Sequence, residues 1–146
     1  MRAVPLIYLL SFGMVIAFIN IKERTNMNTK ILIVDDEKDI IDVLRDRLEQ
    51  EFSEILIASN GSEAVEITDK KRPNIVIMDI NMPVMNGLEA KRMIRKNGLR
   101  IPIVFLSVRP KDELLDDMDD NTIFMEKPVN FKELSSVINQ QIISSN

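Results

Sequence analysis

The stretch Asn74-Ile75-Val76-Ile77-Met78-Asp79-Ile80-Asn81-Met82-Pro83 decides the fold of this chain. Four consecutive apolar residues run from Ile75 to Met78, and Asp79 follows them directly. An unbroken apolar run of this length is typical of a strand that is buried on both faces, as in a parallel sheet. An acid at its end then lies at the carboxyl edge of the sheet, where open α/β sheets bind ligands. Taken alone, Asp79 is more simply explained as a helix cap or turn residue, so the other strand ends must decide.

Outside this stretch, apolar runs alternate with segments of helical periodicity. We predict five strands, at residues 31–34, 54–58, 75–78, 101–106 and 122–125. We also predict five helices, which begin near Asp39, Ser62, Asn86, Pro110 and Asn130; the fourth is a short, very acidic helix over residues 111–118. This alternation specifies an α/β fold, a doubly wound five-stranded parallel sheet with right-handed crossovers and five helices on both faces.

The composition excludes several kinds of site. The chain has 146 residues, enough for one ordinary domain and its core. The net charge of −4 gives no electrostatic footprint for nucleic acid. Because there is no Cys and no His, disulfides, thiolate chemistry and the usual transition-metal ligands are excluded. Any metal must be bound by oxygen, which favours magnesium, calcium or manganese.

The first 26 residues differ from the rest, because residues 3–21 carry no charge. They have three interpretations: a membrane anchor with the Lys22 side cytoplasmic, a secretory signal peptide, or untranslated sequence before a true start at Met27. The late start is the preferred interpretation, and the signal peptide lacks a clean cleavage site. In each case we expect residues 1–26 to lie outside the fold and residues 28–146 to form one domain.

Four of the five predicted strands end in reactive side chains. The first ends in Asp35 and Asp36, the third in Asp79, the fourth in Ser107 and the fifth in Lys127. All strand ends of a parallel sheet lie at the same edge, so these residues can converge. The second strand brings nothing reactive, as expected if it forms the outer edge of the sheet.

The converging groups favour phosphoryl chemistry. Three carboxylates close together repel one another unless a cation lies among them, and a hard divalent ion with carboxylate, carbonyl and water ligands is the magnesium pattern. Lys127 supplies a positive charge and Ser107 a hydroxyl, both of which suit phosphoryl oxygens. An Asp carboxylate beside magnesium can accept phosphate as an acyl phosphate. Each residue also has a plain structural explanation, as a cap, a turn residue or a surface charge, but such an ordered set rarely arises by accident.

The ordered set resembles the receiver domain of two-component response regulators. The matching residues are Asp35-Asp36, Asp79, Asn81-Met82-Pro83, Gly87, Ser107 and Lys127-Pro128. The resemblance covers residues 30 to about 143 and implies a flavodoxin-like sheet order of 2-1-3-4-5. It implies that Asp79 accepts a phosphoryl group from a sensor histidine kinase, a phosphotransfer protein or a small donor such as acetyl phosphate.

The resemblance also implies a role for each matching position around Asp79. Asp36 would ligate Mg²⁺ directly and Asp35 directly or through water, while Asp79 and the backbone carbonyl of Asn81 would complete the protein ligands. Mn²⁺ could replace Mg²⁺ in such a site. Lys127 would pair with the phosphoryl group, and the peptide bond before Pro128 is usually cis in the family.

The same resemblance implies a conformational switch. Ser107 is the hydroxyl expected to move toward the phosphate, and Phe124 stands at the aromatic switch position. A downstream protein partner would bind the face formed by the fourth helix, the fifth strand and the fifth helix.

We therefore expect a stand-alone cytoplasmic phosphoacceptor that signals through a protein partner, bound to a membrane only if residues 1–26 are retained. It would not be an enzyme beyond self-phosphorylation from small donors and autodephosphorylation. The alternative is a magnesium-dependent phosphohydrolase of the haloacid-dehalogenase type, which also uses an Asp nucleophile. That class places a second acid two residues after the nucleophile on the first strand, whereas Asp35 and Asp36 are adjacent. A third hypothesis, a non-phosphorylated scaffold, is disfavoured by the complete set of acids, hydroxyl and lysine.

Overall fold

The computed structural model describes residues 14–15, 29–108, 114 and 116–145. The interpretations of residues 1–26 therefore fall outside the described residues, apart from Met14 and Val15, which are helical and exposed. No helix within the described part of the chain is long and apolar enough to cross a lipid bilayer.

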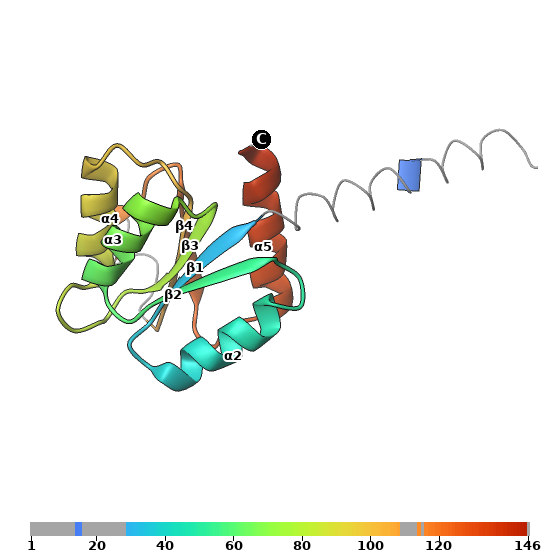
Figure 1. Ribbon diagram of the computed structural model, residues 1–146, viewed down its shortest axis with the longest axis horizontal. Coiled ribbons are helices and arrows are strands. Elements are labelled where there is room, and N and C mark those ends of the chain that lie inside the picture. The colour runs from blue at the N-terminus through green and yellow to red at the C-terminus, as the bar shows by residue number, and fades with distance from the viewer. Residues whose placement is uncertain (1–13, 16–28, 109–113, 115, 146) are drawn as a thin grey trace, which may run out of the picture.

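A five-stranded parallel sheet forms the centre of the domain (Figure 1). Its strands are β1 (Lys30–Val34), β2 (Glu54–Ala58), β3 (Ile75–Asp79), β4 (Ile103–Ser107) and β5 (Thr122–Glu126). They are arranged in the order β2-β1-β3-β4-β5, which confirms the predicted order and places β2 at an edge. β4 starts two residues later than predicted, after Pro102, which has no N–H to donate to a neighbouring strand.

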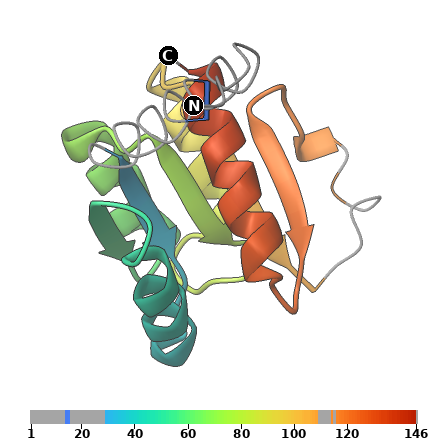
Figure 2. The same ribbon diagram turned by 90° about the vertical axis from the view of Figure 1, so that its right-hand side faces the viewer.

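Helices cover both faces of the sheet. They are α2 (Lys38–Leu48), α3 (Gly61–Lys71), α4 (Gly87–Lys96) and α5 (Phe131–Ser144). α2 and α5 lie on one face and α3 and α4 on the other, and Figure 2 looks onto the face that α5 crosses. Asn60, Asn86 and Asn130 cap α3, α4 and α5 with their side chains.

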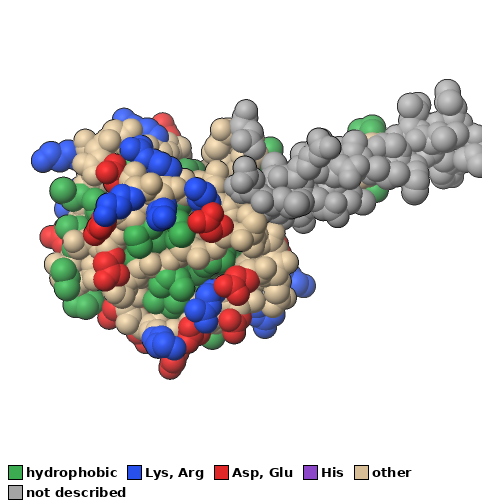
Figure 3. Space-filling model, viewed as in Figure 1, with side chains coloured by type: hydrophobic (Ala, Val, Ile, Leu, Met, Phe, Trp, Pro, Cys, Tyr) green, Lys and Arg blue, Asp and Glu red, His purple; other side chains and the backbone are tan. Residues whose placement is uncertain are grey.

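Side-chain alternation along the strands divides the core into two clusters. In β1, Ile31 and Ile33 pack on the α2/α5 side, while Leu32 and Val34 pack on the α3/α4 side. β2 is less buried than the other strands because it lies at the edge of the sheet and pairs with β1 alone. Its Ile57 side chain is exposed. Figure 3 shows apolar side chains at the surface along this edge, between charged ones.

The predicted helix at residues 111–118 is wrong for the residues that the structure describes, which contain four α-helices rather than five. Leu114, Asp116 and Asp117 lie in 3₁₀-helical turns, and residues 111–113 and 115 are not among those described. Like charges three or four residues apart destabilise a helix, and acids near its C-terminus oppose its dipole. Residues 112–120 contain acids at both of these spacings and also acids at the end where the helix would finish.

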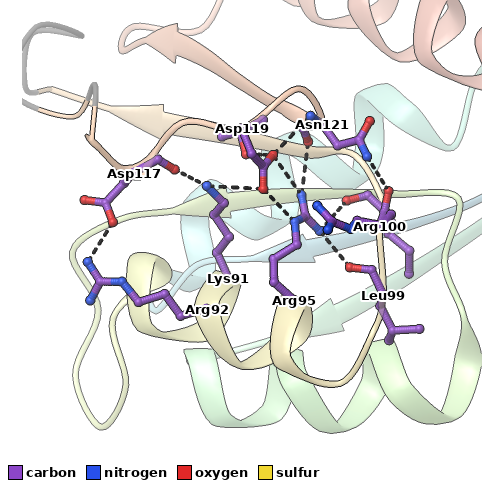
Figure 4. Close-up of polar contacts among 10 residues, drawn as sticks. Lys91, Arg92, Arg95, Leu99, Arg100, Asp117, Asp119 and Asn121 are labelled. Carbon is purple, nitrogen blue, oxygen red and sulfur yellow. Dashed lines mark hydrogen bonds and ion pairs between the residues drawn. The ribbon is translucent and has the colours of Figure 1, made fainter.

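Two acids near the end of this segment, Asp117 and Asp119, form ion pairs with α4 (Figure 4). Arg95 uses all five of its N–H donors. Its Nε and Nη2 donate to the Asp119 carboxylate at 2.8 and 3.3 Å, and Nη1 donates to the Leu99 and Ile101 carbonyls at 3.0 and 2.9 Å. Nη2 also reaches the Asn121 carbonyl at 3.3 Å. Arg95 therefore fastens the segments that enter β4 and β5 to α4.

Two further residues of α4 join this network. Lys91 is only 7% exposed. Its Nζ lies 3.5 Å from Asp119 Oδ2 and donates a hydrogen bond to the Asp117 carbonyl. Arg92, which is exposed, pairs with the Asp117 carboxylate at 2.6 Å. The Arg95 guanidinium holds the pKa of Asp119 well below its usual range, and burial lowers the pKa of Lys91. We call Lys91, Arg92, Arg95, Asp117 and Asp119 the α4 clamp.

Candidate functional site

Three of the predicted site residues lie on the same side of the sheet, at its carboxyl edge. Asp79 is the last residue of β3, Asp35 directly follows β1 and Lys127 directly follows β5. The alternation that buries Ile33 and Ile77 on the α2/α5 side carries Asp35 and Asp79 to that side as well. Strand register thus brings together residues that are far apart in the sequence.

Lys127 lies between the two carboxylates. Its Nζ is 3.0 Å from Asp79 Oδ1 and 3.5 Å from Asp35 Oδ2. All three side chains are largely buried, Asp35 most of all at 2% exposed. The arrangement places one ammonium group against two carboxylates, so the three side chains together carry a net negative charge.

Burial and pairing act in opposite directions on these groups. Burial raises the pKa of Asp35, although a hydrogen bond from the Glu37 N–H (2.9 Å) and the charge of Lys127 partly offset it. Burial alone would lower the pKa of Lys127, but the hydrogen bond and charge of Asp79, with the charge of Asp35, outweigh it and raise that pKa. The ammonium form of Lys127 is therefore the stable one, and the site still favours additional positive charge.

Ser107 ends β4 and is fully buried. Its carbonyl accepts a hydrogen bond from the Lys127 N–H at 2.8 Å, and the peptide bond from Lys127 to Pro128 is cis. Alternation assigns Ser107 to the α3/α4 side with Phe105, whose partner in register is Phe124. Ser107 and Phe124 therefore share one side of the sheet, one step apart on neighbouring strands, while Asp35, Asp79 and Lys127 lie on the other.

Two residues of the predicted metal-ligand set, Asp36 and Asn81, are exposed. Asp36 directly follows Asp35, and Asn81 comes two residues after Asp79. Among the residues that the structure describes, no three acidic side chains are close enough to form a metal site as they stand. The donors nevertheless suit a hard divalent cation, because they are oxygens and, within the described part of the chain, the two buried carboxylates share a single ammonium group.

The loop after Asp79 is closed by a glycine. The Gly87 N–H donates to the Ile80 carbonyl at 2.8 Å, which brings the start of α4 against the end of β3. A Cβ atom at Gly87 would overlap the Asp79 carbonyl and lie 3.1 Å from the Ile80 Cα. Only glycine allows this approach, which fixes both ends of the segment that contains Asn81.

The same loop contains features that sequence reasoning missed. Val84 has a φ of +69° and is 86% exposed, and the Met85 N–H donates to the Pro83 carbonyl at 2.8 Å. The Gly61 N–H at the start of α3 donates to the Met85 carbonyl at 3.0 Å. No local pattern in the sequence indicates this contact between Gly61 and residue 85.

The α4 clamp was missed as well, since residues 111–118 were predicted only as a short, very acidic helix. One signal was present in the sequence: Lys91 falls on the apolar side of α4, beside Ala90 and Ile94, which are buried. A cation at a buried helical position needs a nearby acid.

Comparisons with known proteins agree with this geometry. Residues 31–139 match the family model for the response regulator receiver domain. The chain is 32% identical over 117 residues to the alkaline phosphatase synthesis transcriptional regulatory protein PhoP of Bacillus subtilis, which covers 75% of this chain and 47% of that protein. It is 35% identical over 119 residues to the protein-glutamate methylesterase/protein-glutamine glutaminase of Methanococcoides burtonii, covering 77% of this chain and 34% of that protein. The chain thus spans about half or less of these curated relatives.

A solved structure adds a metal to the comparison. The receiver domain of the sensor histidine kinase PA1611 from Pseudomonas aeruginosa PAO1 has a magnesium ion coordinated in its active-site cleft. It superimposes with a TM-score of 0.69 and 26% identity over 78% of this chain and 97% of that chain.

Proposed function

The chain belongs to the family of response regulator receiver domains, and on this basis we propose that Asp79 is its phosphoacceptor. The observation that carries the proposal is the contact of 3.0 Å between Lys127 Nζ and Asp79 Oδ1, at the carboxyl edge of the sheet. Open α/β sheets bind their ligands at this edge, and the ammonium group beside Asp79 can pair with an incoming phosphoryl oxygen.

In the proposed step, an oxygen of Asp79 forms a bond to phosphorus while the bond from phosphorus to the donor breaks. With a phosphohistidine donor, the electron pair of that bond returns to the imidazole nitrogen, which takes up a proton. Lys127 would exchange its contact with Asp79 Oδ1 for a phosphoryl oxygen. Asp35 would keep Lys127 in place during this exchange, through the contact of 3.5 Å between Lys127 Nζ and Asp35 Oδ2.

We propose that Asp36, Asp79 and the backbone carbonyl of Asn81 hold Mg²⁺, with Asp35 bound directly or through water. Mn²⁺ prefers the same kind of oxygen ligands and would substitute for it. When bound, the metal neutralises the charge that the phosphoryl oxygens bring to a site with several carboxylates. The chemistry of the donor set and the buried charge of Asp35 support this assignment.

Ser107 and Phe124 are the proposed switch. Their common side of the sheet supports the coupling, because a hydroxyl that turned toward phosphate would leave space on the side where Phe124 packs. The predicted partner face included a fourth helix at residues 111–118, which the described residues do not form. We propose instead that β5, α5 and residues 116–121, which are held to α4 by Asp117 and Asp119, form the surface that binds the downstream partner.

Receiver domains accept phosphoryl groups from histidine kinases, and we propose a histidine kinase or phosphotransfer protein as the donor for this chain. The domain would work in the cytoplasm as a stoichiometric phosphoacceptor, with output through a protein partner rather than nucleic acid. Neither the family match nor the relatives support the alternative of a phosphohydrolase of the haloacid-dehalogenase type.

Intact-mass measurement after incubation with acetyl phosphate tests this function. We expect the mass of the wild type to rise by one phosphoryl group when Mg²⁺ is present and not when it is chelated. Asp79→Asn should stay unlabelled, whereas Asp39→Asn, an exposed acid in the first turn of α2, should label normally. Equal labelling of Asp79→Asn would show that the phosphoacceptor lies elsewhere.

A further inference from the structure

We propose that Gly61, the first residue of α3, is a positioning residue for the loop that carries the Asn81 carbonyl. The proposal rests on the proposed function, because it assigns Gly61 a part in Mg²⁺ binding. Gly61 contacts neither the metal nor the phosphoryl group; it acts through Met85, on the far half of the same loop.

The contact between Gly61 and Met85 is specific to glycine. The Gly61 N–H donates to the Met85 carbonyl at 3.0 Å. A Cβ atom at position 61 would lie 2.5 Å from that carbonyl oxygen, 2.9 Å from the Met85 Cγ and 3.0 Å from the Ala90 Cβ. The side chain of Met85 could turn away, but its backbone carbonyl could not move without the loop. Any larger residue at position 61 therefore displaces the loop.

The helix leaves this N–H available. The first N–H groups of a helix have no partner within it. The Asn60 side chain takes the Glu63 N–H, and the Asn60 carbonyl takes the Ala64 N–H. The Gly61 N–H bonds to the loop after β3 instead, so α3 and this loop are tied together.

The loop needs such a tie because it is strained at Val84. The Met85 N–H donates to the Pro83 carbonyl two residues back, and Val84 between them has a φ of +69°. This is a γ-turn of the rare, positive-φ kind, occupied by a β-branched side chain that disfavours it. Strained residues persist where the surrounding structure fixes them. The bond from Gly61 fixes the residue directly after the strained one.

Asn81 lies between the two fixed points of the loop. On one side, the Gly87 N–H holds the Ile80 carbonyl at 2.8 Å; on the other, Gly61 holds Met85. A backbone carbonyl can serve as a metal ligand only if the main chain presents it at the right place. Freeing the Met85 end would let the turn at Val84 relax and would shift the residues before it.

Mg²⁺ affinity of the apo protein, measured by isothermal titration calorimetry, tests the proposal independently of phosphorylation. We expect Gly61→Ala to weaken Mg²⁺ binding roughly 10- to 100-fold, as is typical when a group that orients a ligand is altered. Gly98→Ala is the matched control. A Cβ at Gly98 meets nothing within 4 Å, and its φ of +80° means that the substitution stresses stability alone. It should leave the Mg²⁺ affinity within twofold of the wild type.

The unfolding midpoint of each apo variant separates positioning from stability. If Gly61 served only to begin α3, alanine would suit the position, because alanine is favoured over glycine in a helix. Gly61→Ala would then lose little Mg²⁺ affinity. A folded Gly61→Ala with wild-type Mg²⁺ affinity would overturn the proposal, and so would an equal loss in Gly98→Ala. If the wild type itself binds no Mg²⁺ and accepts no phosphate, the proposed function fails first.

Amide hydrogen exchange in the wild type decides the matter if Gly61→Ala does not fold. Mg²⁺ should slow exchange at the Gly61 N–H severalfold, because its acceptor lies on the metal-binding loop. Exchange at the Gly98 N–H, which bonds to Arg95 within the end of α4, should not change. An unchanged rate at Gly61 would overturn the proposal.

Discussion

Lys127 Nζ lies 3.0 Å from Asp79 Oδ1 and 3.5 Å from Asp35 Oδ2, so one ammonium group bridges two buried carboxylates. This contact joins the ends of β3 and β5 to the end of β1. Each carboxylate depends on the shared cation, because burying an unpaired charge is strongly unfavourable. The pairing with Lys127 explains how two carboxylates can be buried at the edge of the sheet in the absence of phosphate and metal.

Removing the shared cation should destabilise the apo protein and increase its response to metal. We expect Lys127→Met to lower the free energy of unfolding by about 3 kcal/mol without Mg²⁺, since it leaves two buried carboxylates unpaired. Added Mg²⁺ should stabilise Lys127→Met more than the wild type, because the metal replaces the missing positive charge. Chemical denaturation with and without Mg²⁺ measures both effects, with the exposed Lys132→Met as control. Equal stabilisation of both proteins by Mg²⁺ would contradict the bridging role.

Much of this arrangement could be predicted from sequence, because apolar runs and strand ends are local signals. The run ending at Asp79 and the residues after β1, β4 and β5 indicated a parallel sheet with one reactive edge. Contacts that depend on tertiary packing could not be predicted in this way. Gly61 meets Met85, and Arg95 meets Asp119, 24 residues away along the chain. The ion pairs of Asp117 and Asp119 with α4 are tertiary contacts of the same kind. The crowding of like charges over residues 112–120, by contrast, is a local signal against the helix that was predicted at 111–118.

Arg95 and Arg92 should differ sharply in importance, although both pair with acids of the same segment. Arg95→Lys cannot reproduce five donors and should lower the free energy of unfolding by about 2–4 kcal/mol, leaving carbonyls and Asp119 poorly satisfied. Arg92 is 65% exposed, so Arg92→Lys should change stability by about 0.5 kcal/mol or less. Urea denaturation midpoints at constant slope compare the two. Similar losses in both variants would show that the α4 clamp is not centred on Arg95.

Asp119 gives the clamp a dependence on acid. Arg95 lowers the pKa of Asp119 in the folded protein, so its stabilising contribution is present above the ordinary value of 3.8 and is lost as the pH falls through the lowered value. Between neutral pH and pH of about 2, the wild type should therefore lose more unfolding free energy than Asp119→Asn. The exposed neighbour Asp120→Asn should follow the wild-type curve. Parallel curves for wild type and Asp119→Asn would remove Asp119 as the cause.

Ser107→Ala tests the proposed switch. This variant should still accept phosphate at Asp79, since it leaves Asp79 and its contact with Lys127 unchanged. It should lose the change in Phe124 ring resonances that phosphorylation produces in the wild type, because no hydroxyl turns toward the phosphoryl group. NMR spectra with and without acetyl phosphate show this directly, with the exposed Ser136→Ala as control. A full Phe124 response in Ser107→Ala would disprove the coupling.

The central claim, that Asp79 carries the phosphoryl group, is tested most directly by trapping the acyl phosphate. Borohydride reduces an aspartyl phosphate to homoserine, and peptide mapping then identifies the residue that was modified. After incubation with acetyl phosphate and Mg²⁺, we predict homoserine at position 79 and at no other acid. Homoserine at position 35 or 36, or its absence from a protein that had gained phosphate, would contradict the account.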